Sequence, residues 1–374
     1  MKVLVTGSNG FIGKNLCLWL KQHTNFFIFG IDLNNQDRLE EYLLASDFVV
    51  NLAGINRPIN NDEFYDGNVN FMVKIVDFLV SHNMKTPILY SSSIQAAENN
   101  EYGKSKKMAE EYLLKISKQH HIPIYIYRFQ NVFGKWCRPN YNSVVATFCY
   151  NIARGLAITV NDYSAIKEFV YIDDICKEIC SLLNEEKWIG DSNIRYIKEV
   201  YPIRIGDLAK TITQFHENRK TFFVPCFCNE FYSKLYATYL SYLEEHNFDY
   251  PLNSHTDSRG SFTEIFKSIE SGQISVNIGK PGIVKGNHYH NTKNEKFVVL
   301  KGIVSIKFRK INDDKVFEYI VSGEDMKIID IPVGYIHSIT NIGTDDSITL
   351  MWASELFNPE EPDTFFEEVI INEK

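Results

Sequence analysis

The residues whose types and spacing most directly suggest chemistry are two histidines one position apart, His288 and His290, in the segment GNHYHNTKNE. Glu295 ends that segment. Alternate residues of a β-strand point to one face, so the two imidazoles can approach one ion, and a carboxylate from the next strand can join them. Neutral imidazoles with a carboxylate suit Zn²⁺ or Fe²⁺. The pattern predicts a Zn²⁺ site, with Fe²⁺ as the alternative.

A second set of residues, far from the first in the sequence, could transfer a proton to a carbonyl group. Tyr102 and Lys106 are four positions apart in YGKSK, so a helix that begins there places both on one face. The Lys106 ammonium is expected to lower the pKa of the Tyr102 phenol, which is about 10 when unperturbed. A serine hydroxyl from SSS at 91–93 would give the carbonyl oxygen a second hydrogen bond while the carbon receives hydride.

Three glycines near the N-terminus predict a binding site for the pyrophosphate of a dinucleotide. Gly7, Gly10 and Gly13 follow the first apolar run in TGSNGFIG. Without side chains, backbone N–H groups and a helix N-terminus can approach the pyrophosphate closely. The segment NLAG at 51–54 is expected to lie beside this turn. The predicted cofactor contacts are Gly7, Asn9, Gly10, Phe11, Ile12, Gly13, Asp32, Leu52, Ala53, Gly54, Arg57, Tyr102 and Lys106.

The elements that must position these glycines and Tyr102 alternate along the first half of the chain. Short apolar runs such as KVLVTG, FFIFGID and DFVVNLAG are separated by helical patterns such as FIGKNLCLWLKQH and QDRLEEYLLAS. Strands that alternate with helices form a parallel sheet with helices on both faces. We therefore predict an α/β, Rossmann-like, doubly wound domain.

The histidine pair lies in a region of different texture, which begins near residue 252. Short alternating runs rich in Val, Ile and Phe, such as QISVNIG, EKFVVLKG and VSIKFRK, are separated by glycine or asparagine turns. This pattern is typical of an antiparallel sandwich or barrel. We predict two domains, residues 1–248 and 249–374.

Bulk composition agrees with two folded domains that act on small molecules. A chain of 374 residues exceeds what one hydrophobic core usually organises. The net charge of −8 argues against general binding to nucleic acid or to an anionic membrane. The sequence shows neither a membrane-length apolar run nor a signal-peptide core, so we expect a cytoplasmic protein. Its 7 cysteines contain no Cys-x-x-Cys pair and predict no disulfide framework.

The first 245 residues resemble the extended short-chain dehydrogenase/reductases that act on nucleotide sugars. The resemblance rests on TGSNGFIG, NLAG, SSS, YGKSK, NVFG and EFVYIDD. It implies that Ser93, Tyr102 and Lys106 form a catalytic triad and that Asn131 lies by the substrate. Ser93 and Tyr102 are closer in the sequence than in most relatives, so the assignment among Ser91, Ser92 and Ser93 stays open.

The nicotinamide cofactor is predicted to be NADPH. Asp32, at the end of the second predicted strand, could bind a ribose 2′-hydroxyl and favour NADH. Arg38 and Arg57 could instead bind a 2′-phosphate, and reductive relatives with this short second crossover commonly use NADPH.

The C-terminal region resembles the cupin superfamily. Gly282, His288, His290, Glu295 and Gly302 match the spacing of its first motif, and PVGYIHSITN supplies the second, although Met326 replaces that motif's usual first glycine. The resemblance implies an all-β barrel whose metal ligands are His288, His290, Glu295 and His337.

A competing resemblance assigns other roles to the same region. The segment DSRGSFTEIF at 257–266, followed by GIVKGNHYH, is similar to the deoxysugar-nucleotide 3,5-epimerases. This resemblance implies that Arg259 contacts a nucleotide phosphate and that His288 is a base rather than a ligand. We favour the ligand role, because those epimerases lack the pair His290 and Glu295. The base that removes the substrate proton stays open.

The arrangement of both halves resembles the CapF-type enzymes of bacterial capsule and O-antigen synthesis. This resemblance implies a bifunctional enzyme that epimerises C3 of UDP-2-acetamido-2,6-dideoxy-β-L-arabino-hexos-4-ulose and reduces C4 to UDP-2-acetamido-2,6-dideoxy-β-L-talose. The substrate it implies is this UDP-linked keto-sugar. By analogy with cupins and these reductases, which commonly dimerise, we expect a homodimer, and the net charge leads us to expect no nucleic acid or membrane partner. The alternative is a single-step 4-keto-sugar reductase whose cupin is structural or only forms a dimer interface.

Overall fold

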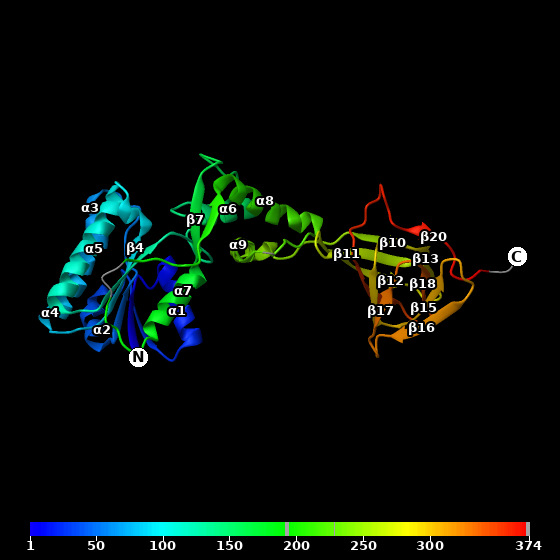
Figure 1. Ribbon diagram of the computed structural model, residues 1–374, viewed down its shortest axis with the longest axis horizontal. Helices are drawn as coiled ribbons and strands as arrows, with labels where there is room; N and C mark the ends of the chain where they lie inside the picture. Colours follow the sequence, from blue (N-terminus) through cyan, green and yellow to red (C-terminus); the bar gives the residue numbers. More distant parts are fainter. Residues whose placement is uncertain (191–193, 228, 372–374) are drawn as a thin grey trace. The chain divides into compact units, whose positions relative to one another are not determined.

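The computed structural model describes residues 1–190, 194–227 and 229–371. The chain divides into two compact units (Figure 1). One unit contains Met1–Thr213 and Ser233–Glu244, and the other contains Gln214–Tyr232 and Glu245–Lys374. The domain boundary at residues 248 and 249 stays a prediction. Among the described residues, none of the helices has the length and apolar character needed to cross a bilayer.

The N-terminal unit is built on a parallel sheet of six strands in the order β2-β1-β3-β4-β5-β8. The sequence predicted this sheet, because its central strands are continuous apolar runs, as expected for strands buried on both faces. The strands are β1 (Lys2–Thr6), β2 (Phe27–Ile31), β3 (Phe48–Asn51), β4 (Ile88–Ser93), β5 (Ile124–Phe129) and β8 (Ile194–Arg195).

Helices cover both faces of this sheet and enclose two separate hydrophobic cores. Helices α2 (Leu39–Ala45), α4 (Phe71–Ser81) and α5 (Glu101–His120) pack on one face, and α1 (Phe11–His23) and α7 (Ile172–Leu183) pack on the other (Figure 1). The predicted doubly wound α/β fold is confirmed. The sheet therefore presents the C-terminal ends of its strands, where such folds bind ligands, along one edge.

Smaller elements complete the part of the chain that precedes β10. A three-stranded sheet has the order β6-β7-β9. Its strands are β6 (Asn131–Phe133), β7 (Ile166–Tyr171) and β9 (Tyr201–Arg204). The remaining helices are α3 (Asp62–Tyr65), α6 (Val144–Ala153), α8 (Ile205–Thr221) and α9 (Glu230–Leu240). Short 3₁₀ or π turns are η1 (Gln36–Arg38), η2 (Asp66–Asn70), η3 (Ile94–Ala97) and η4 (Glu245–Asn247).

The C-terminal unit contains two antiparallel sheets. The six-stranded sheet has the order β10-β11-β12-β19-β14-β17, and the five-stranded sheet has the order β16-β15-β18-β13-β20. The first sheet comprises β10 (Ser254–Asp257), β11 (Gly260–Ser268), β12 (Gly272–Gly279), β14 (Glu295–Lys301), β17 (Ile328–Ile331) and β19 (Ser347–Ala353). The second comprises β13 (Val284–Tyr289), β15 (Ile303–Lys310), β16 (Val316–Ser322), β18 (Tyr335–Asn341) and β20 (Phe365–Phe366).

An apolar core joins the two sheets. Phe297 and Val299 of β14 pack with Ile306 and Phe308 of β15 and with Ile339 of β18. This core follows from the alternating pattern of the strands, whose apolar side chains point inward at every second position. The predicted all-β C-terminal domain is confirmed.

Candidate functional site

The glycine-rich turn between β1 and α1 is shaped by close backbone approaches. Gly7 has a φ of +65°, and a Cβ there would lie 2.9 Å from the backbone nitrogen of Ala53. A Cβ at Gly13 would lie 2.1 Å from the carbonyl oxygen of Gly7. Helix α1 begins at Phe11, and the side-chain-free Gly10 precedes it. The helix N-terminus therefore carries donor N–H groups without a side-chain cap, which suits a phosphate ligand.

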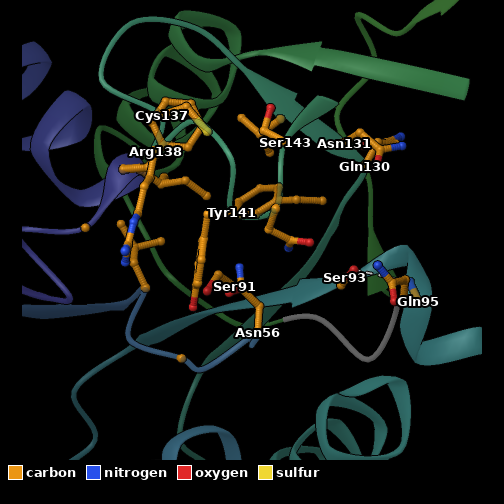
Figure 2. Close-up of a pocket in the computed structure, with 18 of the residues that line it drawn as sticks. Asn56, Ser91, Ser93, Gln95, Gln130, Asn131, Cys137, Arg138, Tyr141 and Ser143 are labelled. Atoms are coloured by element: carbon orange, nitrogen blue, oxygen red, sulfur yellow. Dashed lines mark hydrogen bonds between the residues drawn. The ribbon is translucent and has the colours of Figure 1, made fainter. Parts of the chain in front are cut away.

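A cavity of about 580 Å³ adjoins this helix N-terminus. Its volume is typical of small-molecule sites, which span roughly 300–1,000 Å³. Figure 2 shows Ser93 and Gln95 at one end of the cavity and Arg138 and Tyr141 at the other. The predicted residues in its wall are Asn9, Gly10, Phe11, Ile12, Leu52, Gly54, Ser93, Tyr102, Lys106 and Asn131.

Tyr102 is placed by the start of α5. The side chain of Asn100 caps this helix by accepting a hydrogen bond of 2.8 Å from the Gly103 backbone N–H. Tyr102, in the first turn, then faces the end of β4. Burial raises the pKa of the Tyr102 phenol above its ordinary value, and a hydrogen bond with the Ser93 hydroxyl opposes that rise only in part. The phenol is therefore held in its protonated form.

Lys106 lies one turn further along α5 and is buried. Its Nζ donates a hydrogen bond of 2.9 Å to the carbonyl oxygen of Ser91 and lies 5.9 Å from the centre of the Tyr102 ring. Burial lowers the pKa of Lys106 to about 8, and the nearby Glu110 carboxylate opposes that change. The expected net lowering of the Tyr102 pKa is wrong for this structure, because the pKa is raised overall. The ammonium is directed at a backbone carbonyl, and burial dominates at the phenol.

The three consecutive serines of β4 have different partners. Ser93 contacts the Tyr102 phenol and accepts a hydrogen bond of 3.2 Å from the backbone N–H of Gln95. Ser92 instead donates to the buried carboxylate of Glu110. The same carboxylate accepts two hydrogen bonds, at 2.9 and 2.7 Å, from the Arg128 guanidinium of β5. Ser92 therefore belongs to a network that joins β4, β5 and α5, whereas Ser93 faces the phenol.

The acidic and basic residues considered for cofactor choice lie in three different places. Asp32, at the end of β2, accepts a hydrogen bond from the Asn9 side chain and is thereby joined to the glycine turn. Arg38 pairs with Glu41 at 2.9 Å on the exposed surface. Arg57 lies over the ring of Tyr141, 5.8 Å from its centre, and lines a neighbouring cavity of about 560 Å³.

The two predicted substrate contacts lie in different units. Asn131 lines both cavities of the N-terminal unit, and its amide donates a hydrogen bond of 3.0 Å to the carbonyl oxygen of Glu168. Arg259 lies on the turn between β10 and β11, where it is exposed and makes two hydrogen bonds of 2.7 and 2.9 Å to Asp257. Asn131 is thus part of the cavity wall. Arg259 is a surface cation that is already paired with a carboxylate.

The four predicted metal ligands of the C-terminal unit converge. One ligand atom from each of His288, His290, Glu295 and His337 lies within 4.8 Å of the others. Register explains this convergence, because His288 of β13 pairs directly with His337 of β18. A bulge at Asn287, which has a φ of 57°, precedes that pair. Because an extra residue reverses the side-chain alternation, the bulge sets the face on which His288 lies.

Two of the four residues, His288 and Glu295, have the charge expected of a deprotonated metal ligand. Burial, with a smaller contribution from the two neighbouring imidazoles, lowers the pKa of His288 to about 4, and Glu295 offsets only part of this change. Burial alone would raise the pKa of Glu295, but contacts with His290 and His337 bring it well below the ordinary carboxyl value. His288 is therefore neutral and Glu295 is ionised at neutral pH.

The hydrogen bonds of the cluster fit a cation at its centre. His290 Nδ1 donates to the backbone carbonyl of Asp363, so a neutral His290 carries its lone pair on Nε2. That Nε2 lies 3.2 Å from Glu295 Oε2, and His337 Nε2 lies 3.4 Å from the same oxygen. Both nitrogens of His337 are buried without a hydrogen-bond partner among the described residues. Lone pairs that face one carboxylate oxygen need a proton or a metal ion between them, and this donor set suits Zn²⁺.

Comparison with known proteins agrees with the division of the chain into two units. Residues 3–194 match the model of the NAD dependent epimerase/dehydratase family. The UDP-2-acetamido-2,6-beta-L-arabino-hexul-4-ose reductase of Pseudomonas aeruginosa is 40% identical over 366 residues, which cover 98% of each chain. The chain belongs to the NAD dependent epimerase/dehydratase family. Within that family it is of the CapF type, with a second, C-terminal unit.

Solved structures support this membership over both units. The crystal structure of the capsular polysaccharide assembling protein CapF from Staphylococcus aureus superposes with a TM-score of 0.91, at 45% identity over 99% of this chain and 100% of the other. A CapF structure with the inhibitor 3-isopropenyl-tropolone has a TM-score of 0.87 and is 41% identical over the same shares. Residues 255–365 match the polysaccharide biosynthesis C-terminal domain. The cupin-like unit is therefore shared with these CapF-type proteins.

Several residues that line the cavity beside the glycine turn were not predicted from the sequence. Gln95 lies just beyond β4, and Arg138 and Tyr141 lie in the irregular segment between β6 and α6. Arg138 lies over the Tyr141 ring, 4.8 Å from its centre. These residues belong to no spaced motif. Only their position after the C-terminal ends of parallel strands could have indicated them, because that edge carries the binding loops of such folds.

Proposed function

We propose that this chain is a bifunctional nucleotide-sugar enzyme. The C-terminal unit epimerises C3 of UDP-2-acetamido-2,6-dideoxy-β-L-arabino-hexos-4-ulose, and the N-terminal unit reduces C4 with NADPH to give UDP-2-acetamido-2,6-dideoxy-β-L-talose. The observation that carries the proposal is the contact of Ser93 with a protonated Tyr102 at the wall of a cavity beside the glycine turn. The name of the 40% identical relative supports the UDP-linked substrate, and the name of the 45% identical capsular polysaccharide assembling protein supports a role in capsule synthesis.

In the proposed reduction, this chain supplies the proton and the geometry. NADPH, when bound along the glycine turn, supplies hydride to C4. Tyr102 donates its phenolic proton to O4, and its raised pKa keeps that proton available. Ser93 gives O4 a second hydrogen bond, and the Lys106 ammonium stabilises the negative charge that develops on the phenol. The Ser91 carbonyl holds Lys106 in place for this role.

In the proposed epimerisation, a base removes the C3 proton and a proton returns on the other face. The neighbouring C4 ketone makes the C3 proton acidic, because the charge left on carbon is shared with the carbonyl oxygen. A Zn²⁺ ion held by His288, His290, Glu295 and His337 would supply positive charge near that oxygen. Epimerisation must precede reduction, because reduction removes the ketone on which the acidity depends.

Two observations support a metal ion in the cluster. The Nε2 atoms of His290 and His337 lie 3.2 and 3.4 Å from one oxygen of Glu295. In addition, the inhibitor in the CapF complex is a tropolone, whose adjacent carbonyl and hydroxyl oxygens can chelate a metal ion. We propose His288 as a further ligand, because its ring belongs to the same cluster. A metal-bound imidazole has no free lone pair, so His288 would not then act as the base.

The burial of the cluster favours a second candidate function. His290 and His337 are almost fully buried, and four protein ligands complete the tetrahedral coordination that structural Zn²⁺ sites show. The chain would then be a one-step 4-keto-sugar reductase whose C-terminal unit holds a structural metal or forms a dimer interface. The stereochemistry of the product at C3 separates the two candidates.

The experiment that tests the proposed epimerisation is deuterium exchange. The full chain is incubated in D₂O with the keto-sugar and without NADPH, and deuterium at C3 is measured by NMR. We expect exchange with the parent chain and with Tyr289→Phe, a matched control whose ring stacks on Phe365 at 5.3 Å. We expect loss of exchange with His290→Ala. If His290→Ala exchanges as fast as the parent, the cluster has no part in epimerisation.

A further inference from the structure

A short segment after the last long strand, residues 363–369, lies along the outer edge of β13, the strand that carries the first histidine. Strand β20 pairs with β13 in the register His288↔Phe366 and Tyr289↔Phe365. The backbone N–H of Glu367 donates a hydrogen bond of 2.9 Å to the carbonyl oxygen of Asn287. We call residues 363–369 the strap. It gives β13 a hydrogen-bonded neighbour where the strand would otherwise be an edge.

Asp363, the first residue of the strap, binds the loop that follows His290. Its carboxylate accepts hydrogen bonds of 2.8–3.1 Å from three successive backbone N–H groups, those of Asn291, Thr292 and Lys293. It also accepts one of 3.2 Å from the Thr292 hydroxyl. Successive N–H groups that point to one anion form a nest, and such donors stabilise the ionised carboxylate. Although burial acts to raise it, the pKa of Asp363 is held well below its ordinary value by these donors.

The backbone of the same residue holds the imidazole of His290. The Asp363 carbonyl oxygen accepts the hydrogen bond from His290 Nδ1. A proton fixed on Nδ1 leaves the lone pair on Nε2, which points to Glu295 Oε2 at 3.2 Å. Asp363 therefore binds the loop through its carboxylate and the His290 ring through its carbonyl oxygen. Movement of this residue would change the direction of the His290 lone pair.

We propose that Asp363 is a positioning residue for His290 and thereby sets the affinity of the cluster for a divalent metal ion. The Asp363 carboxylate is bound in the nest of residues 291–293. This contact holds the Asp363 carbonyl in the place where it fixes the tautomer and direction of the His290 ring. This inference rests on the metal site of the proposed function. Partners of this kind, which orient a ligand without touching the metal, typically change metal affinity about 10–100-fold when removed.

Other contacts hold the strap without Asp363, which makes a matched control possible. Arg309 of β15 is buried. It pairs with the Glu367 carboxylate at 2.6 Å and donates 3.1 Å and 2.8 Å hydrogen bonds to the carbonyls of Val369 and Glu368. Asp363→Asn keeps the size of the side chain but removes the negative charge that the nest binds at Oδ2, and it places an amide N–H₂ where Oδ1 accepts from the Asn291 N–H. Glu367→Gln weakens another strap contact and leaves the His290 hydrogen bond in place.

Metal affinity provides the first test. The full chain and both variants are stripped with a chelator, and Zn²⁺ is titrated in competition with a chromophoric chelator. We expect Asp363→Asn to bind Zn²⁺ about 10–100-fold more weakly than the parent, and Glu367→Gln to stay within about threefold. Equal affinity of Asp363→Asn and parent overturns the inference. A parent chain without Zn²⁺ affinity instead overturns the metal site of the proposed function.

A second measurement reports on the ring itself. In the metal-free chain labelled with ¹⁵N-histidine, the hydrogen-bonded Nδ1–H of His290 is expected to give a slowly exchanging NMR signal. That signal should persist in Glu367→Gln and weaken or disappear in Asp363→Asn. A purely structural role of Asp363 predicts lower stability with an unchanged Nδ1–H signal, and that result would contradict the inference whether or not Zn²⁺ binds.

Discussion

The two candidate sites of this chain are built in different ways. The N-terminal site collects residues from the glycine turn, the end of β4 and the start of α5 around a cavity of about 580 Å³. The C-terminal cluster draws His288 and His337 from directly paired positions of two strands, and two of its four ligand residues, His290 and His337, are buried. The first arrangement leaves room for a cofactor and a substrate. The second is compact enough to hold a single ion, so its chemistry depends on whether substrate can reach that ion.

The largest expected effect is a loss of reduction in the N-terminal unit that leaves metal binding by the C-terminal unit unchanged. Tyr102→Phe removes the proton donor while leaving the ring, so the rate of NADPH oxidation with the keto-sugar should fall about 10²–10⁴-fold. Absorbance at the NADPH band measures it. Because Tyr102 lies outside the C-terminal unit, Zn²⁺ affinity should equal that of the parent. A reduction rate within a few fold of the parent would remove Tyr102 from the mechanism.

The next effect distinguishes neighbouring serines within the N-terminal site. Ser93→Ala removes the hydroxyl that contacts Tyr102, and a rate loss of about 10²–10³-fold is expected from the loss of one preorganised donor. Ser92→Ala is the matched control, because that hydroxyl bonds to Glu110. It should lower stability by about 1 kcal/mol and leave the rate within a few fold. If Ser92→Ala reduced the keto-sugar more slowly than Ser93→Ala, Ser92 rather than Ser93 would be the catalytic serine.

Metal addition should stabilise the chain through the C-terminal cluster. Zn²⁺ at about 100 times its dissociation constant is expected to add about 2.7 kcal/mol to the free energy of unfolding. Chemical denaturation with and without the metal measures this gain. His337→Ala should lose most of it, because the variant removes a buried ligand, whereas Tyr102→Phe should keep it. An equal gain in His337→Ala would show that the metal binds elsewhere.

The smallest expected effect is a pH dependence of the reduction. The pKa of Lys106 is lowered to about 8, so this side chain is charged below that pH and loses its proton above it. Tyr102, with its raised pKa, stays protonated over the same range. The value of kcat/KM should therefore fall as pH rises through about 8, because it reports on groups of the free enzyme.

A variant sharpens this test. The Glu110 carboxylate acts to raise the pKa of Lys106, so Glu110→Gln should move the fall in kcat/KM to lower pH. Circular dichroism must first show that the variant is folded, because the half-buried Arg128 loses a charged partner. An unchanged profile in a folded variant would mean that Lys106 is not the group that titrates.

Local motifs made much of both sites predictable from the sequence. The glycine turn and the pair Tyr102 and Lys106 depend on spacing within one turn or one helix, and such spacing is visible in the residues themselves. The convergence of His288 and His290 follows from the two-residue repeat of a strand. The doubly wound sheet was predictable because its buried strands are uninterrupted apolar runs.

What the sequence did not reveal depends on contacts between distant segments. The bulge at Asn287 is a feature of pairing with β18, and Asp363 meets the loop after His290 from 70 or more positions away. Nothing in the local residue pattern encodes either contact. The predicted direction of the Tyr102 pKa shift was wrong for a similar reason. The prediction considered only the Lys106 ammonium, whereas the burial of the phenol and the hydrogen bond from Lys106 to Ser91 depend on the folded structure.

The measurement that tests the central claim most directly is deuterium exchange by Tyr102→Phe. The variant is incubated with the keto-sugar and NADPH in D₂O, and NADPH oxidation and deuterium at C3 are followed in one sample. If two separate sites carry out two successive steps, deuterium enters C3 at the parental rate while NADPH oxidation is nearly abolished. Loss of both activities together would contradict the account, because it would mean that one site performs both steps or that the cluster serves only the fold.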